Sequence, residues 1–405
     1  MKNSTFKKMI SALTALILVI CMTAGAASAG SSGSDPYYTA EDQFTERDLE
    51  QTADLSGAET IAVTDGSDVQ ITKAGVYVLT GTAADATVYV EAGDEDKVQL
   101  VLDGVSITNT DFPCIYVVSA DKVFITVSSD SSLSVTGSFR QDGSTHPDGV
   151  IFSKQDLVLN GTACLTISSA ENGIVCKDDL KVTGGTYVIS SSSKAMEAND
   201  SIRIAGGSFT LTAGTDGIHA ENNDDNSKGY VFISGGEFTI NAGDDGIHAV
   251  SVLQIDGGTV SVTAREGLEA TVIQINGGTV HIVSTDDGIN AARKSSAYTP
   301  EVIFNGGETT VTMGSGDTDG VDSNGNIYIN GGTVYVNGNS TFDYDGTAEF
   351  NGGTVYLNGQ QTSTIPNQFM GGMGGGWGGW QGGGAQQDDG WGPSQGGQAG
   401  GRGGR

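Results

Sequence analysis

The feature that most constrains the fold of this chain is a Gly-Gly step that recurs every 20–29 residues between positions 184 and 353. A short apolar strand precedes each step and an alternating strand follows it, as in VLQIDGGTVSV and VIQINGGTVHI. A third short segment carries a D-G-I motif, and helical periodicity is absent. Three short strands per repeat are typical of a parallel β-helix, whose coils bury their apolar faces by stacking. We therefore predict an all-β solenoid of roughly a dozen coils over residues 55–368.

Alternation along the strands assigns side chains to the core or to the surface. We expect the following residues to point inward: Val260, Val262, Ile273, Ile275, Ile282, Phe304, Ile327, Ile329, Val334 and Phe350. We expect Gln254, Thr259, Ser261, Gln274, Thr279 and His281 to point outward. Asp256, Asn276, Asn305, Asn330 and Asn351 each precede a Gly-Gly step. Because asparagine tolerates the left-handed backbone of a corner, we predict a structural row of side chains that hydrogen-bond from coil to coil.

The two ends of the chain differ from the repeat region. Residues 1–29 combine three lysines, an apolar run and a terminal Ala-Ser-Ala. This pattern predicts a signal peptide cleaved after Ala29, hence a secreted protein, extracellular or associated with the cell surface; a retained membrane anchor is the alternative. Residues 30–54, with the polar stretch that continues to Ser56, are a candidate cap for the N-terminal edge. The Gly-rich residues 369–405 predict a flexible tail, whose three tryptophans either contact polysaccharide or have no partner.

Charge and cysteine content exclude several classes of protein. The chain has 19 basic and 49 acidic residues, a net charge of −30, which argues against nucleic acid and favours cations or a solvated extracellular surface. Beyond the N-terminal segment, nothing is apolar enough to span a membrane. Cys114, Cys164 and Cys176 are too few for a disulfide framework, although Cys164 and Cys176 could pair. We expect a monomer.

The D-G-I motif occurs five times, so we expect its acidic residues to form columns rather than one catalytic site. Equivalent residues of adjacent coils lie ~4.8 Å apart. The first column is Lys194, Asp216, Asp245, Glu266, Asp287 and Asp319, and the second is Glu197, His219, His248, Glu269, Asn290 and Asp322. Asp244, Asp286 and Asp317 lie just before the first column. The glycine after each acid either turns the chain into a strand or leaves room for a ligand.

Neighbouring carboxylates in such a column repel each other by about 1 kcal/mol per pair in water. Lys194 is the only basic residue within the first column. Two Ca–O bonds of about 2.3–2.6 Å span the distance between coils, which predicts bridging calcium ions. The predicted ligands are Asp216, Asp244, Asp245, Glu266, Glu269, Asp286, Asp287, Asp317, Asp319 and Asp322. A solvated acidic face is the alternative. His219 and His248 add a zinc alternative, but oxygen ligands outnumber them.

Several motifs together resemble a family of secreted bacterial carbohydrate-binding β-helix proteins known from cellulolytic clostridia. They are FTERDLE (44–50), VQLVLDGVSITN (98–109), IYVVSADKVFIT (115–126) and the repeated DDGIHA and NGGTV. The resemblance covers nearly all of the chain between its two ends. It implies a right-handed parallel β-helix similar to pectate lyases, with calcium ions along one face. It also implies binding, without cleavage, of cellulose-like and acidic, pectin-type polysaccharides.

Three functions are compatible with these features. In a binding protein, calcium helps to hold an acidic polysaccharide, and Tyr328, Tyr335 and Tyr356 stack on sugar rings; β-propensity alone is the alternative for these tyrosines. A calcium-dependent pectate-type lyase needs a Lys or Arg base, for which Lys194 is the candidate. The third possibility is a surface or matrix protein stiffened by calcium. Because the acidic motif repeats with no coil privileged, we favour binding and assign no catalytic residue.

Overall fold

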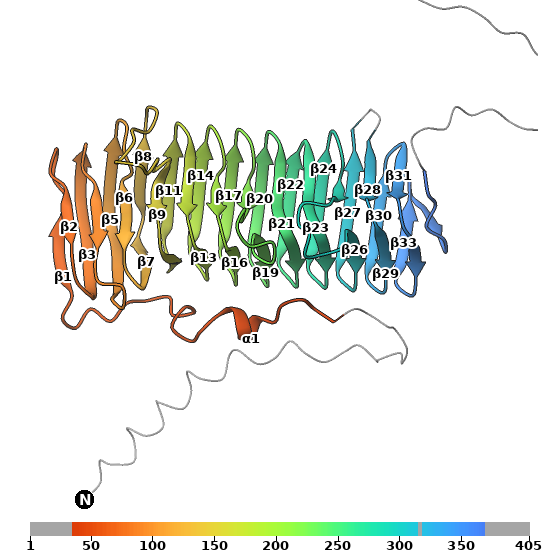
Figure 1. The fold of residues 1–405 in the computed structure, drawn as a ribbon, viewed down its shortest axis with the longest axis horizontal. Helices are drawn as coiled ribbons and strands as arrows, with labels where there is room; N and C mark the ends of the chain where they lie inside the picture. Colours follow the sequence, from red (N-terminus) through yellow and green to blue (C-terminus); the bar gives the residue numbers. More distant parts are fainter. Residues whose placement is uncertain (1–34, 315–317, 369–405) are drawn as a thin grey trace, which may run out of the picture. The chain divides into compact units, whose positions relative to one another are not determined.

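The computed structural model describes residues 35–314 and 318–368. Within them the fold is all-β, with one short helix, α1 (Ala40–Gln43), and one long, mostly parallel sheet. Most strands pair with the strand three places further along the chain, for example β11 with β14 and β14 with β17. Consecutive sets of strands, called coils below, therefore stack side by side in chain order (Figure 1). This pairing fits the predicted β-helix.

The strands form three faces, each continued from coil to coil. The ladder face consists of β2 (Val69–Ile71), β4 (Val88–Glu91), β6 (Ile115–Ser119), β9 (Gly149–Ser153), β12 (Asn172–Cys176), β15 (Met196–Ala198), β18 (Ile218–Ala220), the first parts of β21 (Asp245–Ile255) and β23 (Glu266–Ile275), β25 (Ile289–Ala291), β28 (Asp319–Ser323) and β31 (Ser340–Tyr344). The strap face consists of β1 (Glu59–Ala62), the first parts of β3 (Gly75–Ala84) and β5 (Lys97–Asn109), β7 (Lys122–Ser129), β10 (Asp156–Gly161), β13 (Asp179–Val182), β16 (Ser201–Ile204), β19 (Tyr230–Ile233), the second parts of β21 and β23, β26 (Glu301–Phe304), β29 (Asn326–Ile329) and β32 (Ala348–Phe350).

The third face, called the hydroxyl face, begins with the second parts of β3 and β5. It continues through β8 (Ser131–Val135), β11 (Cys164–Ser169), β14 (Thr186–Ser191), β17 (Ser208–Ala213), β20 (Glu237–Ala242), β22 (Thr259–Ala264), β24 (Thr279–Ser284), β27 (Glu308–Met313), β30 (Thr333–Asn337) and β33 (Thr354–Leu357). The last strand, β34 (Gln360–Thr362), pairs antiparallel with β33.

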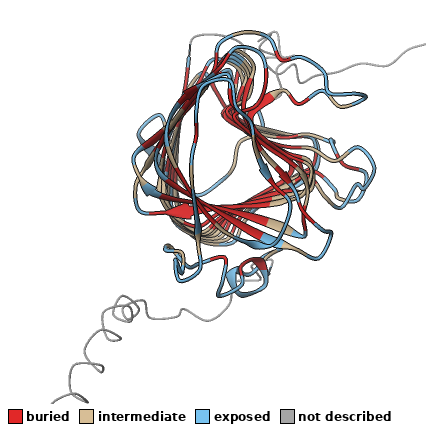
Figure 2. Cartoon of the chain, turned by 90° about the vertical axis from the view of Figure 1, so that its left-hand side faces the viewer, coloured by how far each residue is buried: buried red, intermediate tan, exposed pale blue. Residues whose placement is uncertain are grey.

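The three faces enclose an apolar core. Nine of the ten residues predicted to point inward are at most 3% exposed, and the tenth, Phe350, is half-buried and packs against the core. Viewed along the stack, the buried residues line the strands, while many exposed residues lie in the connections (Figure 2). No coil could bury this surface alone, so the stacking that the repeat predicts also supplies the core.

The left-handed backbone predicted for the corners is found at the second glycine of each Gly-Gly step, and not at the Asp or Asn before it. In the corner at 277–278 the second glycine has φ +81°, a left-handed value that glycine adopts without strain. A Cβ on Gly277 would lie 2.5 Å from the Asp256 carbonyl oxygen of the preceding coil. The Asn row is confirmed: Asn276 donates to Asp256 (2.7 Å), Asn305 to Asn276 (2.8 Å), Asn330 to Asn305 (2.8 Å) and Asn351 to Asn330 (3.0 Å).

The N-terminal strap (residues 35–56) lies along the strap face, not over the N-terminal edge as predicted. The Tyr38 N–H donates to Gln254 Oε1 at 2.9 Å, and Arg47 donates to Gln99 Oε1 at 2.9 Å. Gln254 and Gln274 point out of the coils but are fully buried. The strap provides partners for their side chains: Gln274 Nε2 donates to the Asp35 carbonyl at 3.3 Å. A side chain that faces outward is therefore not exposed where the strap crosses it.

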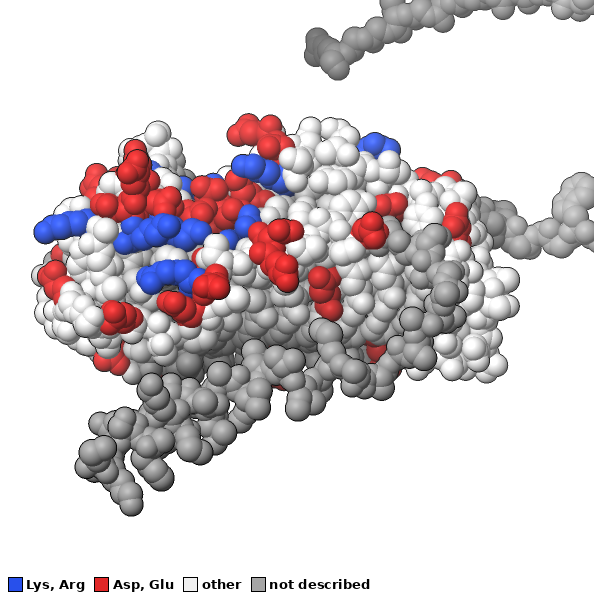
Figure 3. Space-filling model, turned by 90° about the horizontal axis from the view of Figure 1, so that it is seen from below, with Lys and Arg blue, Asp and Glu red and all other residues white. Residues whose placement is uncertain are grey.

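Asp48 anchors the strap between basic side chains of the strap face. Lys181 Nζ donates to Asp48 Oδ2 at 2.9 Å, and Lys122 Nζ lies 3.8 Å from Asp48 Oδ1. Seen from below, basic and acidic side chains are interleaved towards the N-terminal coils (Figure 3). The charges on this part of the protein are therefore paired across elements.

Cys114, Cys164 and Cys176 are free thiols, so the pairing of Cys164 with Cys176 is absent. Among residues 35–314 and 318–368, no helix has the length and apolar character needed to cross a membrane. The predicted signal peptide and Gly-rich tail lie outside the described residues.

Candidate functional site

The ladder face brings the two predicted columns into register. Backbone pairing aligns Ile218, Ile247, Leu268, Ile289 and Val321, each two residues after an acid of the first column. In the second column Glu197, His219, His248, Glu269, Asn290 and Asp322 pair in that order. Asp317 lies outside the described residues. The alignment drawn from the D-G-I motif is therefore correct.

Basic side chains neutralise the middle of the ladder, which the sequence analysis did not anticipate. Arg265 lies 2.6 Å from Asp244 and 2.7 Å from Glu266, and it also contacts Asp286. Lys294 Nζ lies 2.6 Å from Glu269 Oε1. Arg265 and Lys294 belong to neither column. Their side chains reach the columns from the connections before β23 and after β25. Lys194 is still the only base within the first column, but Arg265 and Lys294 offset the acids from outside it.

Two histidines stack in the middle of the ladder. Their ring centroids are 4.6 Å apart and their planes differ by 18°. His219 Nδ1 lies 2.8 Å from Asp216 Oδ2, and His248 Nδ1 lies 2.8 Å from both Asp245 Oδ2 and Glu269 Oε2. Burial on its own would lower the pKa of His248, but its hydrogen bonds to Asp245 and Glu269 raise this pKa to about 9. His248 is therefore a cation shared by two carboxylates.

The C-terminal ladder (Asp287, Asp319 and Asp322) carries concentrated negative charge. Burial raises the pKa of Asp287 to about 6, and the nearby carboxylates of Asp286 and Asp319 also raise it. Burial raises the pKa of Asp322 to about 7, again with help from neighbouring carboxylates. Within the described residues, neither Asp287 nor Asp322 forms an ion pair with Lys, Arg or His. This end of the ladder retains the repulsion that the sequence predicts.

The oxygen atoms near the C-terminal ladder suit a hard cation. The Asp319 N–H donates to Asp287 Oδ1 at 3.1 Å, and Ser340 donates to Asp319. Asn290 Oδ1 and Thr318 Oγ1 are buried without a hydrogen-bond partner among the described residues. Carboxylate, amide and hydroxyl oxygens are the ligands that Ca²⁺ prefers. The residues present therefore fit calcium in chemistry.

Lys194, the candidate base of a lyase, lies at the N-terminal end of the first column. Its Nζ lies 3.2 Å from Glu197 Oε2, and Lys177 Nζ lies 2.9 Å from Glu197 Oε1. An ion pair with Glu197 accounts for Lys194 without invoking proton abstraction.

The structure separates the three tyrosines predicted to bind sugar. Tyr335 and Tyr356 pair on the hydroxyl face, where their rings stack at 4.9 Å with planes 10° apart. Tyr328 lies on the strap face and packs against the small apolar cluster of Val252, Val272 and Ile303. Only Tyr335 and Tyr356 therefore form a joint aromatic surface.

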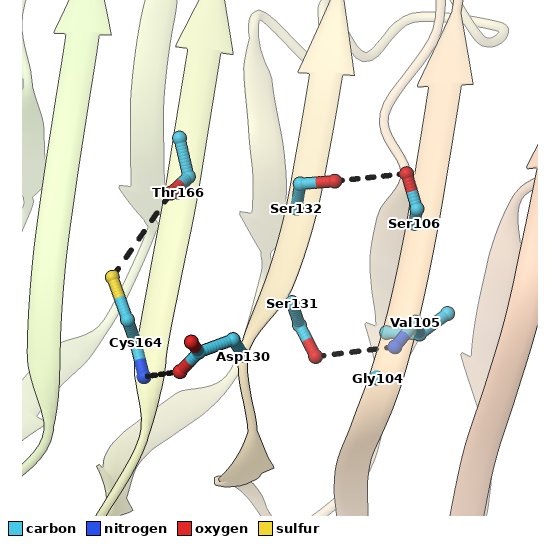
Figure 4. Close-up of a pocket in the computed structure, with 8 residues that line it drawn as sticks. All are labelled: Gly104, Val105, Ser106, Asp130, Ser131, Ser132, Cys164 and Thr166. Carbon is cyan, nitrogen blue, oxygen red and sulfur yellow. Dashed lines mark hydrogen bonds between the residues drawn. The ribbon is translucent and has the colours of Figure 1, made fainter.

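The column that contains Tyr335 and Tyr356 has no carboxylate and no Lys or Arg. From Ser106 onwards its residues are Ser106, Ser132, Thr166, Val188, Thr210, Thr239, Ser261, His281, Thr310, Tyr335 and Tyr356. Its first residues border a pocket of about 270 Å³, which Asp130 and Cys164 also line (Figure 4). Sequence reasoning missed this pocket because its residues come from three separate parts of the chain, and only Gly104, Val105 and Ser106 belong to a quoted motif, VQLVLDGVSITN.

The glycines of the D-G-I motif are explained by packing. A Cβ on Gly246 would lie 2.2 Å from Val262 Cγ1 and 2.5 Å from the Gly267 carbonyl oxygen. Gly267 and Gly288 would make similar contacts with the core and with the next coil. The missing Cβ thus lets adjacent coils approach, and it faces the core rather than a ligand on the surface.

The sequence of this chain is similar to those of known proteins. Residues 65–320 match the family described as carbohydrate-binding domain-containing protein. A protein of that description from Acetivibrio thermocellus is 37% identical over 127 residues, 30% of this chain and 44% of that protein. The chain thus matches less than half of that relative's length.

A similar solved structure is described as the polysaccharide lyase-like protein from C. thermocellum, in a gadolinium derivative. It is 33% identical, has a TM-score of 0.50, and the match covers 53% of this chain and 96% of that one. The family match itself spans more than half of the sequence. The chain is a member of the carbohydrate-binding domain-containing protein family.

Proposed function

We propose that this protein is a secreted, calcium-dependent polysaccharide-binding protein with a right-handed, pectate-lyase-like parallel β-helix. Its ligands are acidic, pectin-type chains and cellulose-like chains, which it holds without cleaving them. Family membership supports a carbohydrate ligand, and the polysaccharide lyase-like neighbour supports a β-helix. The observation that carries the proposal is the C-terminal ladder, in which the half-buried carboxylates of Asp287 and Asp322 lie near further carboxylates that raise their pKa values and, among the described residues, form no ion pair with Lys, Arg or His.

The C-terminal ladder would hold calcium through Asp287, Asp319 and Asp322, with Asn290 and Thr318 close by in the same coils. Calcium supplies positive charge that the carboxylates of both the protein and a uronic acid chain can share. The protein's own contribution is to keep its carboxylates at fixed positions on paired strands and to desolvate them partly. Because the carboxylates lie in adjacent coils, an extended anionic chain can run along the stack of coils and meet them one after another. In the middle of the ladder Asp216, Asp244 and Asp245 offer carboxylate oxygens within 4.8 Å of one another, but Arg265 already pairs with Asp244.

Neutral polysaccharide chains require a surface that is not lined by carboxylates, and the column of Tyr335 and Tyr356 on the hydroxyl face provides one. Tyr335 and Tyr356 offer two stacked rings beside a column of small hydroxyl side chains. Aromatic rings bind the apolar faces of sugars, while an uncharged surface imposes no desolvation cost for ions. We assign cellulose-like chains to this face and anionic chains to the ladder face. Cleavage is not proposed, because Lys194, the candidate base, is paired with Glu197 and lies at the opposite end of the column from the C-terminal ladder.

Replacing Asp287 and Asp322 together by asparagine tests the calcium role. We expect the double variant to lose at least tenfold in affinity for polygalacturonate in calcium, because two charged ligands are removed; tenfold corresponds to about 1.4 kcal/mol. Affinity gels with calcium or with chelator measure the change. The matched control is Asp94→Asn with Glu95→Gln, which removes the same charge from an exposed loop. Equal calcium-dependent retention of the double variant and the wild type would refute the assignment.

Replacing Tyr335 and Tyr356 by alanine tests the hydroxyl face. We expect about a tenfold loss of affinity for cello-oligosaccharides, equal to about 1.4 kcal/mol, because both rings that would pack on the sugar are removed. Polygalacturonate binding should not change. Tyr328→Ala is the matched control, because this ring lies on the strap face. If Tyr328→Ala weakens cello-oligosaccharide binding as much as the double variant does, the neutral ligand occupies another face.

A further inference from the structure

We propose that Asp245, His248 and Glu269 form a binding site for a divalent transition metal of the zinc class. Their candidate ligand atoms all lie within 4.8 Å of one another. His248 Nδ1 is 2.8 Å from Asp245 Oδ2 and 2.8 Å from Glu269 Oε2. One nitrogen and two carboxylates, with a fourth position for water, are a ligand set that Zn²⁺ accepts. This site differs in chemistry from the all-oxygen C-terminal ladder and does not depend on polysaccharide binding.

The separations of the three groups are close to those that zinc requires. With bonds of about 2.0–2.2 Å meeting at tetrahedral angles, neighbouring ligand atoms lie roughly 3.4 Å apart. The nitrogen–oxygen separations of 2.8 Å therefore need to widen by about half an ångström. Side-chain torsions suffice, because His248 and Glu269 project from directly paired positions of β21 and β23. The backbone of the site can stay as it is.

An independent observation also points to a ligand at this position. Asp245 is 5% exposed, and its Oδ1 is buried without a hydrogen-bond partner among the described residues. A buried carboxylate oxygen without a partner is costly, and a metal ion would satisfy it. Glu266 pairs with Asp245 across adjacent coils and adds a further carboxylate beside the site.

The surrounding side chains hold the ligands in place. Lys294 Nζ contacts Glu269 Oε1 at 2.6 Å, which leaves Oε2 directed at His248. The ring of His219 stacks on His248 and is itself oriented by Asp216. Metal binding would form a bond to His248 Nδ1 and release the proton now shared there to solvent, so that each ion bound displaces one proton from this ring. No other atom of the site changes its covalent bonds.

The test uses the full chain after chelator treatment and dialysis. We expect calorimetry to show one Zn²⁺ bound with proton release, and Co²⁺ to give the visible absorption of a tetrahedral site. His248→Gln should weaken Zn²⁺ binding at least tenfold and abolish the Co²⁺ spectrum. His281→Gln is the matched control, because His281 is exposed on the hydroxyl face and should bind as the wild type does. Neither variant should alter calcium-dependent binding to polygalacturonate.

A measurement on the wild-type chain covers the case in which His248→Gln fails to fold. The sequence contains four histidines, so their imidazole signals can be followed by NMR as Zn²⁺ is added. The signal of His248 should change to that of an Nδ1-bound ring at one equivalent of metal. The proposal is overturned if His248 does not respond, if His248→Gln binds Zn²⁺ as tightly as the wild type, or if equimolar Ca²⁺ displaces Co²⁺.

Discussion

Asp48→Ala is expected to destabilise the protein by about 3–5 kcal/mol, the usual cost of leaving one member of a buried ion pair without its partner. Asp48 is 1% exposed and Lys181 is 6% exposed. Burial alone would raise the pKa of Asp48, but hydrogen bonds from Lys181 and the Thr45 N–H lower it below its usual value. The side chain is therefore ionised at neutral pH. Thermal unfolding should shift down by on the order of 10 °C.

The matched control for Asp48→Ala is Glu50→Gln in the same segment. Glu50 forms only an exposed ion pair with Arg47 at 3.7 Å, so its loss should cost about 0.5 kcal/mol or less. Combining Asp48→Ala with Lys181→Met should recover most of the lost stability, since both charges are then gone. If the double variant is as unstable as Asp48→Ala, the strap itself, and not the unpaired lysine, accounts for the loss.

In chelator, the protein is expected to lose stability as the pH rises from about 5 to about 8. The pKa of Asp287 is raised to about 6 and those of Glu266 and Asp322 to about 7, chiefly by burial, whereas unfolded acids ionise near pH 4. Over this window the folded state binds more protons than the unfolded state, so stability falls as protons are removed. His248, with its pKa raised to about 9 by Asp245 and Glu269, changes stability in the same direction above about pH 6.5.

Calcium should weaken this trend, because it favours the ionised forms of Asp287 and Asp322. Thermal unfolding in chelator at pH 5 and pH 8 should differ by roughly 5–10 °C, and excess calcium should remove the part of the difference that comes from these two carboxylates. The Asp287→Asn, Asp322→Asn variant should show a smaller pH effect even in chelator. An identical pH profile with calcium and with chelator would contradict calcium binding at the C-terminal ladder. Calcium stabilisation without any effect on polygalacturonate binding would instead favour a matrix protein.

The local pattern of the chain predicted most of the fold and the register of the ladder. Alternation placed residues such as Val260 and Ile273 in the core, and the D-G-I repeat aligned Asp245 with Glu266 and His248 with Glu269. These features follow from a period of two along each strand and from parallel pairing between similar coils. Both are local rules, so they can be read from sequence.

The charge balance of the ladder could not be predicted in the same way. Arg265 precedes Glu266 directly, yet its side chain bridges Asp244 and Asp286, residues of the preceding and following repeats. Lys294 reaches Glu269 from the loop after β25. Such contacts depend on how loops and long side chains fold back over the strands. Only the tertiary structure showed that the middle of the ladder is neutralised while its C-terminal end is not.

The sequence by itself determined the repeating coils, their inward and outward residues and the two columns of the ladder, because each coil repeats the same short-range pattern. The tertiary structure decided what covers each face. Gln254 was correctly placed outside its coil, but Tyr38, 216 residues earlier, buries it. Tyr328, Tyr335 and Tyr356 have similar sequence contexts, yet only Tyr335 and Tyr356 stack together. These outcomes rest on contacts between distant segments, and such contacts leave no periodic signal in the chain.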